Sequence, residues 1–527
     1  MKGANRPTVD RRTLLKLTGA AGATTSLGAI AGCLGDPDDD DDLEEITITL
    51  SEFPDTVDPI DHITGDYFDV FDHIYEPLFN IEPGEPPEPR VVEDWDHDDG
   101  AVDMTLRDDV QFHDGQDLVA EDVVFTLERQ IDPEAGPASS QVAGLGSIET
   151  AEAVDDHTVR FEYSGAPELA EFEFGNYARA MSQSWTEDQD AAESGEIVGD
   201  SADIFNGTGP YEVVDFTSDT EIVLERFDDY WGEEPPFERI TFNDDDESST
   251  RAAALETGDA DLTININPED TGIVDDADGV EIRNVTSFRN IFCPMKNESE
   301  PFDSQEFRQA MNYAVDNEGI IEEVLGGWGE PMSQPIPPGV NGYNPDLDPY
   351  PQDVEQAEQL VEESGYAGVE IELVVPQGRY LNDAEVGQTV ADQIDQLENV
   401  DCDADVVEFG TVSDANSAGM DDYEIPFFMI GWGVITGDAD YGLAGFFREG
   451  AGVQSFRDEE LDEAIEESQG IEDPDEREQR LQEVNEMARE KAPWIFLHLQ
   501  ESIYGVREDI QWEPREDESI WAWDMDV

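Results

Sequence analysis

The sequence predicts an α/β protein built from about two or three domains. Stretches in which apolar and polar residues alternate at period two lie between stretches that carry helix-capping residues, and this mixture is typical of α/β folds. At 527 residues, the chain is long enough to bury a large core and to divide into domains. Apolar residues make up 38% and aromatic residues 9% of the chain, which is enough for ordinary cores.

Five short stretches predict β-strands, because apolar and polar residues alternate along them. The first is EITITL, which places Ile46, Ile48 and Leu50 on one face. The ranges of the five are 45–50, 102–106, 158–163, 220–225 and 239–243.

Two helices are predicted from the glycines that follow them. The helix at 248–257 is followed by Gly258, and the helix at 353–364 by Gly365. Glycine adopts the left-handed backbone that ends many helices, so each marks a C-terminus.

Three further elements are predicted in the second half of the chain. A strand at 369–376 precedes a helix at about 383–397. A long helix is predicted at 474–491, with Asp473 as its N-cap and Pro474 at its first position. A proline two residues beyond its last residue ends it.

The charge balance of the chain predicts a folded protein with an acidic surface. The chain has 131 acidic and 26 basic residues, a net charge of -105. The apolar content argues against disorder. At molar salt the Debye length is about 3 Å, so the repulsion between these charges is screened. The composition therefore indicates a halophilic protein, and it excludes nucleic-acid binding, which needs a basic patch.

The N-terminal segment is predicted to be an export signal. RRTLLK at 11–16 resembles a twin-arginine motif, and IAGC, which ends at Cys33, resembles a lipobox. We expect residues 1–33 to be a lipoprotein signal peptide that ends at a lipidated Cys33; the alternative is a helix with chance arginines. The acidic run at 34–44 predicts a disordered tether. No other stretch is apolar enough for a transmembrane helix.

Enzymatic and metal-dependent functions find little support in the sequence. Three cysteines give no disulfide framework, and the six histidines have no zinc spacing. The chain has no nucleophile elbow and no phosphate-binding loop. Adjacent acidic residues arise by chance in so acidic a chain. We therefore expect no enzyme, no cofactor and no metal site.

Several motifs resemble one protein family. LRDDVQFHDGQDLVAEDVVFTLERQ at 106–130 resembles the signature of family 5 extracellular solute-binding proteins, the peptide, nickel and oligosaccharide receptors of ABC importers. Its HDG is a tight turn, after which Ala120 and Glu121 open a helix. Supporting motifs follow in family order: IYEPLF, NGTGPYEV, YWGEEPPFERITF, LETGDADL, PFDSQEFRQAMNYAVD and GWGVITGDAD.

The resemblance implies a two-lobed clamshell like that of periplasmic binding proteins, with an extra inserted domain. The expected first lobe comprises 45–80, 205–290 and 495–527, the inserted domain 81–204, and the second lobe 291–494. The implied protein is a monomer on the outer face of the cytoplasmic membrane, held by its lipid anchor. It captures dipeptides or oligopeptides and delivers them to the permease and ATPase subunits of the importer.

The resemblance also implies ligand-binding residues in two loops. In PQGRY, Arg379 stands where peptide receptors bind the ligand carboxylate, followed by Tyr380. In GWGVITGDAD, Trp432 offers a flat apolar wall. Ile435 replaces the aspartate that binds the peptide amine, so Asp438 or Asp440 is the candidate substitute.

Arg289 and Asn290, in SFRNIF, fall in the crossover region and are further candidates for the cleft. Each residue also has a structural alternative: the aspartates as part of the acidic surface, the arginine in PQGRY as a salt bridge, and the tryptophan as core packing. A non-peptide solute, such as an oligosaccharide or a nickel complex, is the alternative ligand. A calcium-binding surface structural protein is a third alternative.

Overall fold

The structure is a computed structural model that describes most of the chain after the tether. The predicted signal peptide with Cys33, nearly all of the tether, and Ile435 lie outside the described residues. Among the residues described, no helix combines the length and the apolar character needed to span a membrane. The described ranges are 44–53, 57–60, 65–82, 87–98, 100–131, 145, 148–163, 170–189, 197, 199, 201–218, 220–420, 423–434, 436–471 and 473–526.

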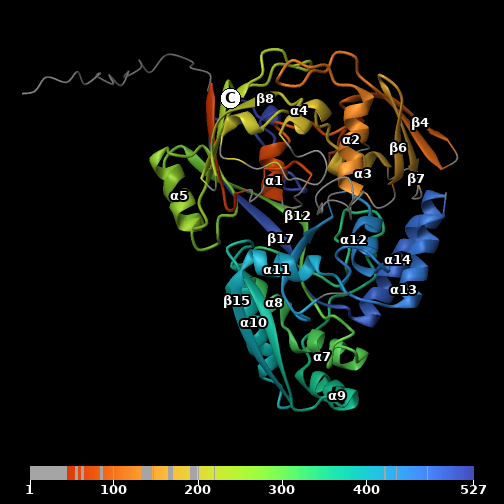
Figure 1. Cartoon of the computed structure of the whole chain (residues 1–527). Coiled ribbons are helices and arrows are strands. Elements are labelled where there is room, and N and C mark those ends of the chain that lie inside the picture. The colour runs from red at the N-terminus through yellow and green to blue at the C-terminus, as the bar shows by residue number, and fades with distance from the viewer. Residues whose placement is uncertain are drawn as a thin grey trace, which may run out of the picture. The chain divides into compact units, whose positions relative to one another are not determined.

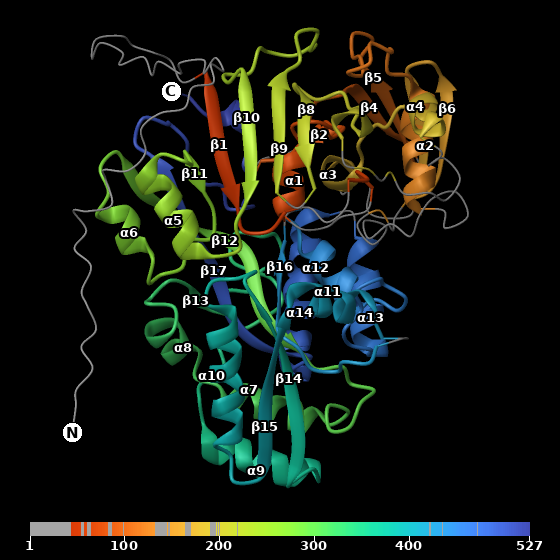
Figure 2. The same cartoon turned by 60° about the vertical axis from the view of Figure 1, so that its left-hand side comes forward.

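A large mixed sheet forms the centre of the body (Figures 1 and 2). Its nine strands lie in the order β16-β12-β17-β11-β1-β10-β9-β8, with β13 paired to β17. Strand β1 runs parallel to β10 and β11, whereas the other pairs are antiparallel. The strands are β1 (Glu45–Leu50), β8 (Tyr211–Thr217), β9 (Glu221–Arg226), β10 (Arg239–Asp244), β11 (Leu262–Thr263), β12 (Val280–Pro294), β13 (Glu330–Pro331), β16 (Ile430–Gly433) and β17 (Trp494–Arg507).

The long strands β12 and β17 connect the two ends of the body. They pair antiparallel from Val280↔Arg507 to Pro294↔Trp494, with register shifts between Thr286 and Asn290 and between Ile291 and Phe292. Figure 2 shows them running between β1, β8, β9 and β10 at one end and β14 and β15 at the other. We call the part around β1 and β8–β10 the first lobe, and the part around β14 and β15 the second lobe.

The second lobe is a compact α/β unit. Strands β14 (Val369–Gln377) and β15 (Val400–Glu408) pair in parallel, and α10 (Asp383–Asp395) connects them and packs on both. Apolar side chains at every second position of β14, such as Ile371 and Leu373, are buried there. The other helices are α7 (Gln305–Ala314), α8 (Asn317–Glu323), α9 (Val354–Ser364), α11 (Phe409–Ser417), α12 (Ala439–Phe447), α13 (Glu459–Gln469) and α14 (Pro474–Lys491).

A separate four-stranded sheet lies beside the first lobe. Its order is β4-β5-β7-β6, and α2 packs on β6 and β7. Its core is made by buried side chains from within residues 78–180. The elements are β4 (Val92–Asp98), β5 (Ala101–Leu106), β6 (Ile148–Asp155), β7 (Thr158–Tyr163), α2 (Ala120–Ile131), α3 (Ala170–Tyr177) and α4 (Gln183–Asp188).

The remaining elements are short. They are α1 (Gly65–Phe71), β2 (Phe79–Asn80), β3 (Glu88–Pro89), α5 (Ser248–Thr257), α6 (Thr271–Asp275) and the 3₁₀ turns η3 (Ala202–Ile204) and η4 (Ala522–Asp524). The domain boundaries expected from the sequence stay a prediction.

The predicted capping residues lie at the ends of their helices in the structure. Gly258 and Gly365 follow α5 and α9 with φ of 74° and 85°. Asp473 caps α14 by accepting a hydrogen bond from the backbone N–H of Glu476. Helix α10 ends two residues before the predicted position, because its end carries no capping signal in the sequence.

Three of the family motifs meet where the four-stranded sheet adjoins the first lobe. In FHDG, the backbone N–H of His113 donates to the carbonyl of Gly207 at 2.9 Å, and its side chain contacts Gly209 O at 3.0 Å. Gly209 N–H in turn donates to the carbonyl of Ile74, in IYEPLF, at 2.8 Å. A Cβ atom on Gly207 would lie 1.9 Å from that same oxygen, so only glycine allows this approach.

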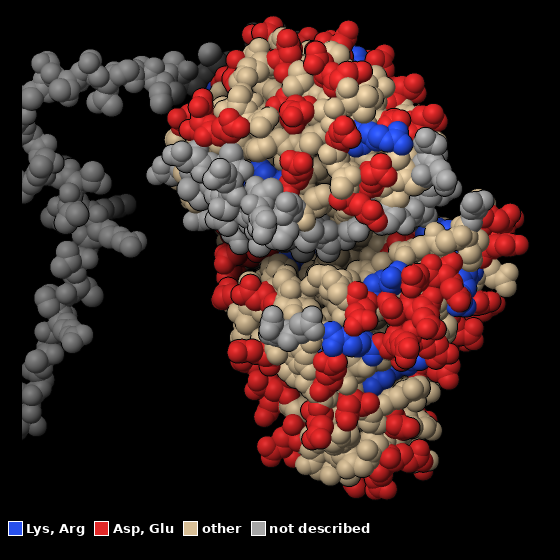
Figure 3. Space-filling model, turned by 45° about the vertical axis from the view of Figure 1, so that its right-hand side comes forward, with Lys and Arg blue, Asp and Glu red and all other residues tan. Residues whose placement is uncertain are grey.

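The surface is acidic, as the composition predicted. Figure 3 shows Asp and Glu spread over the face in view, with a few basic side chains among them. Basic side chains of the described residues are paired with carboxylates, as in Arg448 with Asp462 at 2.8 Å and Arg457 with Glu298 at 2.7 Å. The basic residues therefore form no large positive patch in this view.

Candidate ligand-binding cavity

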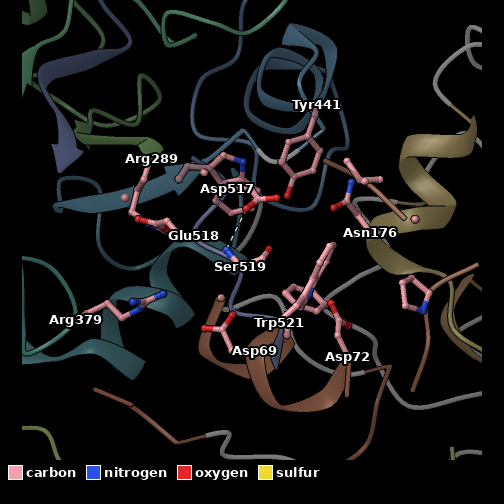
Figure 4. A pocket seen from close by; sticks show the side chains of 18 of the residues that line it. Asp69, Asp72, Asn176, Arg289, Arg379, Tyr441, Asp517, Glu518, Ser519 and Trp521 are labelled. Atoms are coloured by element: carbon pink, nitrogen blue, oxygen red, sulfur yellow. Dashed lines mark hydrogen bonds and ion pairs between the residues drawn. The ribbon is translucent and has the colours of Figure 1, made fainter. Parts of the chain in front are cut away.

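A cavity of about 110 Å³ lies where the two lobes, the crossover strands and the C-terminal segment meet (Figure 4). Its charged lining comes from segments far apart in the sequence, which only the folded chain brings together. The charged residues that line it are Asp69, Asp72, Arg179, Arg289, Arg379, Asp517 and Glu518. The aromatic residues that line it are Phe68, Phe79, Tyr380, Phe409, Trp432, Tyr441 and Trp521.

Aromatic side chains form one wall of this cavity. The rings of Trp432 and Tyr441 stack with centroids 5.7 Å apart and an interplanar angle of 29°. The Tyr441 hydroxyl is hydrogen-bonded to that of Tyr177, which joins α12 of the second lobe to α3. The buried indole N–H of Trp432 has no acceptor among the described residues. A buried donor of this kind is expected to find a partner, and a ligand oxygen can provide one.

Arg289 and Glu518 form a part-buried ion pair at the cavity, with side chains 12% and 16% exposed. The Arg289 Nε donates to Oε2 of Glu518 at 2.7 Å. Glu518 also accepts from Gln500 Nε2 at 3.0 Å and from Ser502 Oγ at 2.6 Å. Although burial alone would raise it, the pKa of Glu518 is lowered by the charge and hydrogen bond of Arg289 and by the hydrogen bond from Ser502. The carboxylate is therefore ionised at neutral pH.

Arg179 and Asp72 form a second buried pair. The Arg179 Nε donates to Asp72 Oδ1 at 2.9 Å, and the guanidinium lies 4.8 Å from the ring centroid of Phe68. Burial raises the pKa of Asp72, and the attraction of Arg179 opposes that rise.

Arg379 reaches the cavity from a rigid turn that follows β14. The Asp383 carboxylate holds this turn by accepting from the backbone N–H groups of Gly378, Arg379 and Tyr380 at 3.1, 2.8 and 3.0 Å. The Arg379 Nε lies 3.5 Å from Glu52 Oε2, at the end of β1. Figure 4 shows the Arg379 side chain extending toward the other labelled residues.

Four of the seven ligand-binding residues predicted from the sequence line this cavity. They are Arg289, Arg379, Tyr380 and Trp432. Tyr380 also donates its hydroxyl to the carbonyl of Gly431 at 3.3 Å.

The other three predicted residues are not among the described residues that line the cavity. Asn290 donates to the carbonyls of Gln334 and Pro335 at 3.3 and 3.0 Å. Asp438 caps α12, and Arg477 donates to both of its carboxylate oxygens at 2.6 and 2.8 Å. These contacts give Asn290 and Asp438 structural roles in the second lobe.

Asp440 lies in the first turn of α12, where its Oδ2 accepts from Gln469 Nε2 at 3.1 Å. Burial, and secondly the charge of Asp438, raise the pKa of Asp440 to about 6.

Sequence reasoning missed several residues of the lining, notably Asp72, Arg179 and Glu518. Basic residues are scarce in this chain, 26 against 131 acidic ones, and that scarcity is the one sequence signal that could have drawn attention to Arg179. Nothing in the local sequence distinguishes Glu518 from the many other carboxylates of the acidic chain.

A second, wider groove of about 600 Å³ adjoins the cavity, and Arg379 and Phe409 line both. Carboxylates from both lobes line this groove, among them Glu52, Asp244 and Glu408. No cluster of three or more His, Cys, Asp or Glu side chains suited to a metal ion occurs in the described part of the chain.

Comparisons with known proteins match this chain to solute-binding proteins. The model of "bacterial extracellular solute-binding proteins, family 5 middle" matches residues 86–454. Heme-binding protein A of Haemophilus influenzae is 27% identical over 439 residues, covering 77% of this chain and 78% of that protein. The dipeptide-binding protein of Escherichia coli is 25% identical over 449 residues, covering 80% and 83%.

Solved structures share the fold. The periplasmic binding protein DppA of Helicobacter pylori, solved with the peptide STSA, superposes with a TM-score of 0.81 at 21% identity, covering 92% of this chain and 98% of that one. NikA of Staphylococcus aureus, solved with a nickel–histidine complex, gives a TM-score of 0.77 at 18% identity, covering 92% and 100%. The predicted two-lobed α/β clamshell is confirmed.

Proposed function

Because the chain belongs to family 5 of the extracellular solute-binding proteins, we propose that it is the receptor of an ABC importer and captures dipeptides or oligopeptides. The observation that carries the proposal is the cavity itself. It combines arginines, carboxylates and an aromatic wall, and these are the groups that recognise the termini and side chains of a peptide.

In this proposal, Arg379 binds the ligand carboxylate through its guanidinium, and Trp432 receives an apolar side chain. The unpaired indole N–H of Trp432 donates to a ligand carbonyl. Closure of the two lobes around the ligand follows from its higher affinity for the closed state.

The location of the protein is part of the proposal. Twin-arginine export and a lipid on Cys33 would hold a monomeric receptor at the outer face of the cytoplasmic membrane, with residues 34–44 as tether. There it would pass its ligand to the permease and ATPase subunits. The acidic surface supports a halophilic protein that works in concentrated salt.

A non-peptide solute is the second candidate. The stacked rings of Trp432 and Tyr441 would suit a sugar ring as well as an apolar side chain, which favours an oligosaccharide. A nickel complex is the other non-peptide candidate. The groups that coordinate the nickel ion would then have to come largely from the bound solute.

A thermal-shift screen in molar salt tests the proposal with peptides, oligosaccharides and nickel–histidine. A ligand present at 100 Kd stabilises the folded state by about 2.7 kcal/mol. Peptides are expected to raise the melting temperature. A shift with sugars and none with peptides would contradict the peptide proposal.

The variant Arg379→Ala tests the proposed ligand carboxylate contact. Its affinity for a peptide is expected to fall by about 2–5 kcal/mol. Arg457→Ala, which removes a half-buried arginine paired to Glu298 in the second lobe, is the control and is expected to bind as the wild type does. Unchanged affinity in Arg379→Ala would remove Arg379 from the site.

A further inference from the structure

We infer that Asn416 is a further ligand-binding residue which, together with Trp432, selects ligands that carry an uncharged amide group. Such a group occurs in the peptide unit and in N-acetylated sugars. The inference rests on the proposed function in one respect, because it takes the cavity as the ligand-binding site. It does not require that the ligand be a peptide.

Asn416 and Trp432 each bring one unpaired polar atom to the lining of the cavity. Asn416 lies near the end of α11 and is 3% exposed, and its buried Oδ1 has no donor among the described residues. The buried Nε1 of Trp432, on β16, has no acceptor in the described part of the chain. An unpaired buried polar atom costs free energy, which a ligand that supplies the missing partner recovers.

The chain holds Asn416 firmly in place. Phe409, Ser413 and Asn416 all line the cavity, and their spacing of four and three residues places them on one face of α11. The buried Lys296 donates from its Nζ to two backbone carbonyls of the turn that carries Asn416, at 2.8 and 2.6 Å. A side chain that is fixed in this way and still left unpaired is typical of a preorganised binding residue.

Asn416 and Trp432 are also held relative to each other. Side chains of α11 and β16, among them Val412 and Ile430, belong to one hydrophobic core, and the Trp432 ring packs against it. A close-packed core of this kind moves as a unit. Opening and closing of the lobes would therefore carry the two residues together.

The two unpaired atoms differ in hydrogen-bonding character, and this decides which ligand group satisfies both. An ammonium group can donate to Asn416 Oδ1 but cannot accept from Trp432 Nε1. A carboxylate can accept from Trp432 but cannot donate to that oxygen. An amide does both, because its donor N–H and its acceptor oxygen lie on separate atoms.

Charged side chains of the same cavity are paired within the protein. Arg289 donates to Glu518 at 2.7 Å, and Arg179 donates to Asp72 at 2.9 Å. A charged ligand group has to compete with these internal partners, whereas an amide that binds at Asn416 displaces none of them.

The variant Asn416→Leu separates binding from structure. It replaces an unpaired carboxamide with an apolar side chain of similar size, so the ligand-free protein should unfold at the same temperature or a higher one. Asn312→Leu, in α7, is the matched control, because Asn312 is also 3% exposed. The Asn312 Nδ2 donates to the carbonyl of Trp494 at 2.8 Å, and its Oδ1 accepts from the N–H of Phe496 at 3.2 Å. Loss of these bonds should lower the melting temperature.

Isothermal titration calorimetry on the full chain at pH 7.5 in molar KCl measures binding with two sets of probes. The first set is Ala-Phe-Ala and its two analogues in which one peptide N–H is replaced by an ester oxygen. The second is N,N′-diacetylchitobiose and cellobiose, which has hydroxyl groups in place of the acetamido groups. The wild type should bind the amide member about tenfold more tightly, the effect of one hydrogen bond to a buried group. This preference should be lost in Asn416→Leu and in the smaller Asn416→Ala, and kept in Asn312→Leu.

Failure of the inference differs from failure of the proposed function. If only the sugars bind, the peptide proposal fails, and the affinity ratio of the two sugars still tests Asn416. An amide preference that is absent in the wild type, or that survives in both Asn416 variants, overturns the inference for whichever set binds. A melting temperature lowered in Asn416→Leu as far as in Asn312→Leu would assign Asn416 a structural role and would overturn it as well.

Discussion

Arg289 and Glu518 lie 229 positions apart in the sequence, and they form a part-buried ion pair at the candidate ligand-binding cavity. The pair fixes the C-terminal segment against the crossover strand β12. Arg515 and Asp517 form a second pair in the same segment at 2.9 Å. The C-terminal segment that carries Asp517 and Glu518 therefore forms one wall of the cavity.

Replacing Glu518 with Gln is expected to destabilise the protein by about 3 kcal/mol, because it leaves the largely buried Arg289 charge, whose side chain is 12% exposed, without its counter-ion. Urea denaturation at constant salt measures this. Glu281→Gln is the control: Glu281 pairs with Arg283 on β12, the strand that also carries Arg289, and its side chain is more exposed than that of Glu518. This variant should lower the free energy of unfolding by less than about 1 kcal/mol. Equal losses in the two variants would contradict the structural role of Glu518.

Replacing Gly207 with Ala is expected to be severely destabilising. The new Cβ would lie 1.9 Å from the backbone oxygen of Ile74, and neither backbone can move without breaking the contact of three motifs. The expected loss is at least about 3 kcal/mol in the same denaturation assay. Gly272→Ala in α6, where no atom lies within 4 Å of the added Cβ, should change stability by about 0.5 kcal/mol or less.

Acidification is expected to weaken the fold through His73. Its Nδ1 donates to the carbonyl of Asp69 at 2.8 Å, and its Nε2 accepts from the N–H of Ala522 at 2.9 Å. Burial lowers the pKa of His73 to about 3. The unfolded chain therefore binds a proton below about pH 6.5 that the folded chain does not, so stability falls as pH falls, by about 1.4 kcal/mol per unit.

The test compares the pH dependence of unfolding free energy between pH 6.5 and 4.5 in the wild type and in His73→Asn. The variant should show the shallower fall. His157→Asn, in the turn between β6 and β7, serves as the reference for a half-buried histidine. A slope in His73→Asn as steep as that of the wild type would rule out His73 as the source.

Asp440 is expected to behave in the opposite way. Its folded pKa is raised to about 6, so its contribution to stability is full below about pH 3.9 and is lost as pH rises through 6. Asp440→Asn should therefore stabilise the protein at pH 8, by about 2 kcal/mol, and have little effect at pH 4.

The neighbouring variant Asp438→Asn provides the contrast for this prediction. It removes the partner of the buried Arg477 and should destabilise the protein at pH 8. Thermal unfolding of both variants at the two pH values measures the difference. If Asp440→Asn weakened ligand binding without changing stability, Asp440 would belong to the binding site after all.

Salt is expected to stabilise the protein strongly. With a net charge of -105, raising KCl from 0.1 to 1 M shortens the Debye length from about 10 to about 3 Å and screens the repulsion. The midpoint of thermal unfolding should rise over this range and rise little with an isosmotic amount of sucrose. A similar rise with sucrose would assign the effect to solute exclusion and not to charge.

The sequence by itself determined the elements whose signals are local. Asp473, Gly258 and Gly365 marked helix ends because a cap is a hydrogen bond or a backbone conformation within one turn. The acidic surface and the family also followed from the sequence, because composition and the order of motifs do not depend on which residues contact one another in the fold. Three residues of the cavity were found through the resemblance of their loops, and Arg289 was found through its place in the crossover region.

Only the tertiary structure decided how those residues are paired. Glu518 reaches Arg289, and Glu52 reaches Arg379, because the registers of β12, β17 and β1 bring distant segments together. The same folding pairs Asp438 with Arg477. In a chain with 131 carboxylates, any arginine has many possible partners, and the choice among them is made by long-range packing that no local pattern encodes.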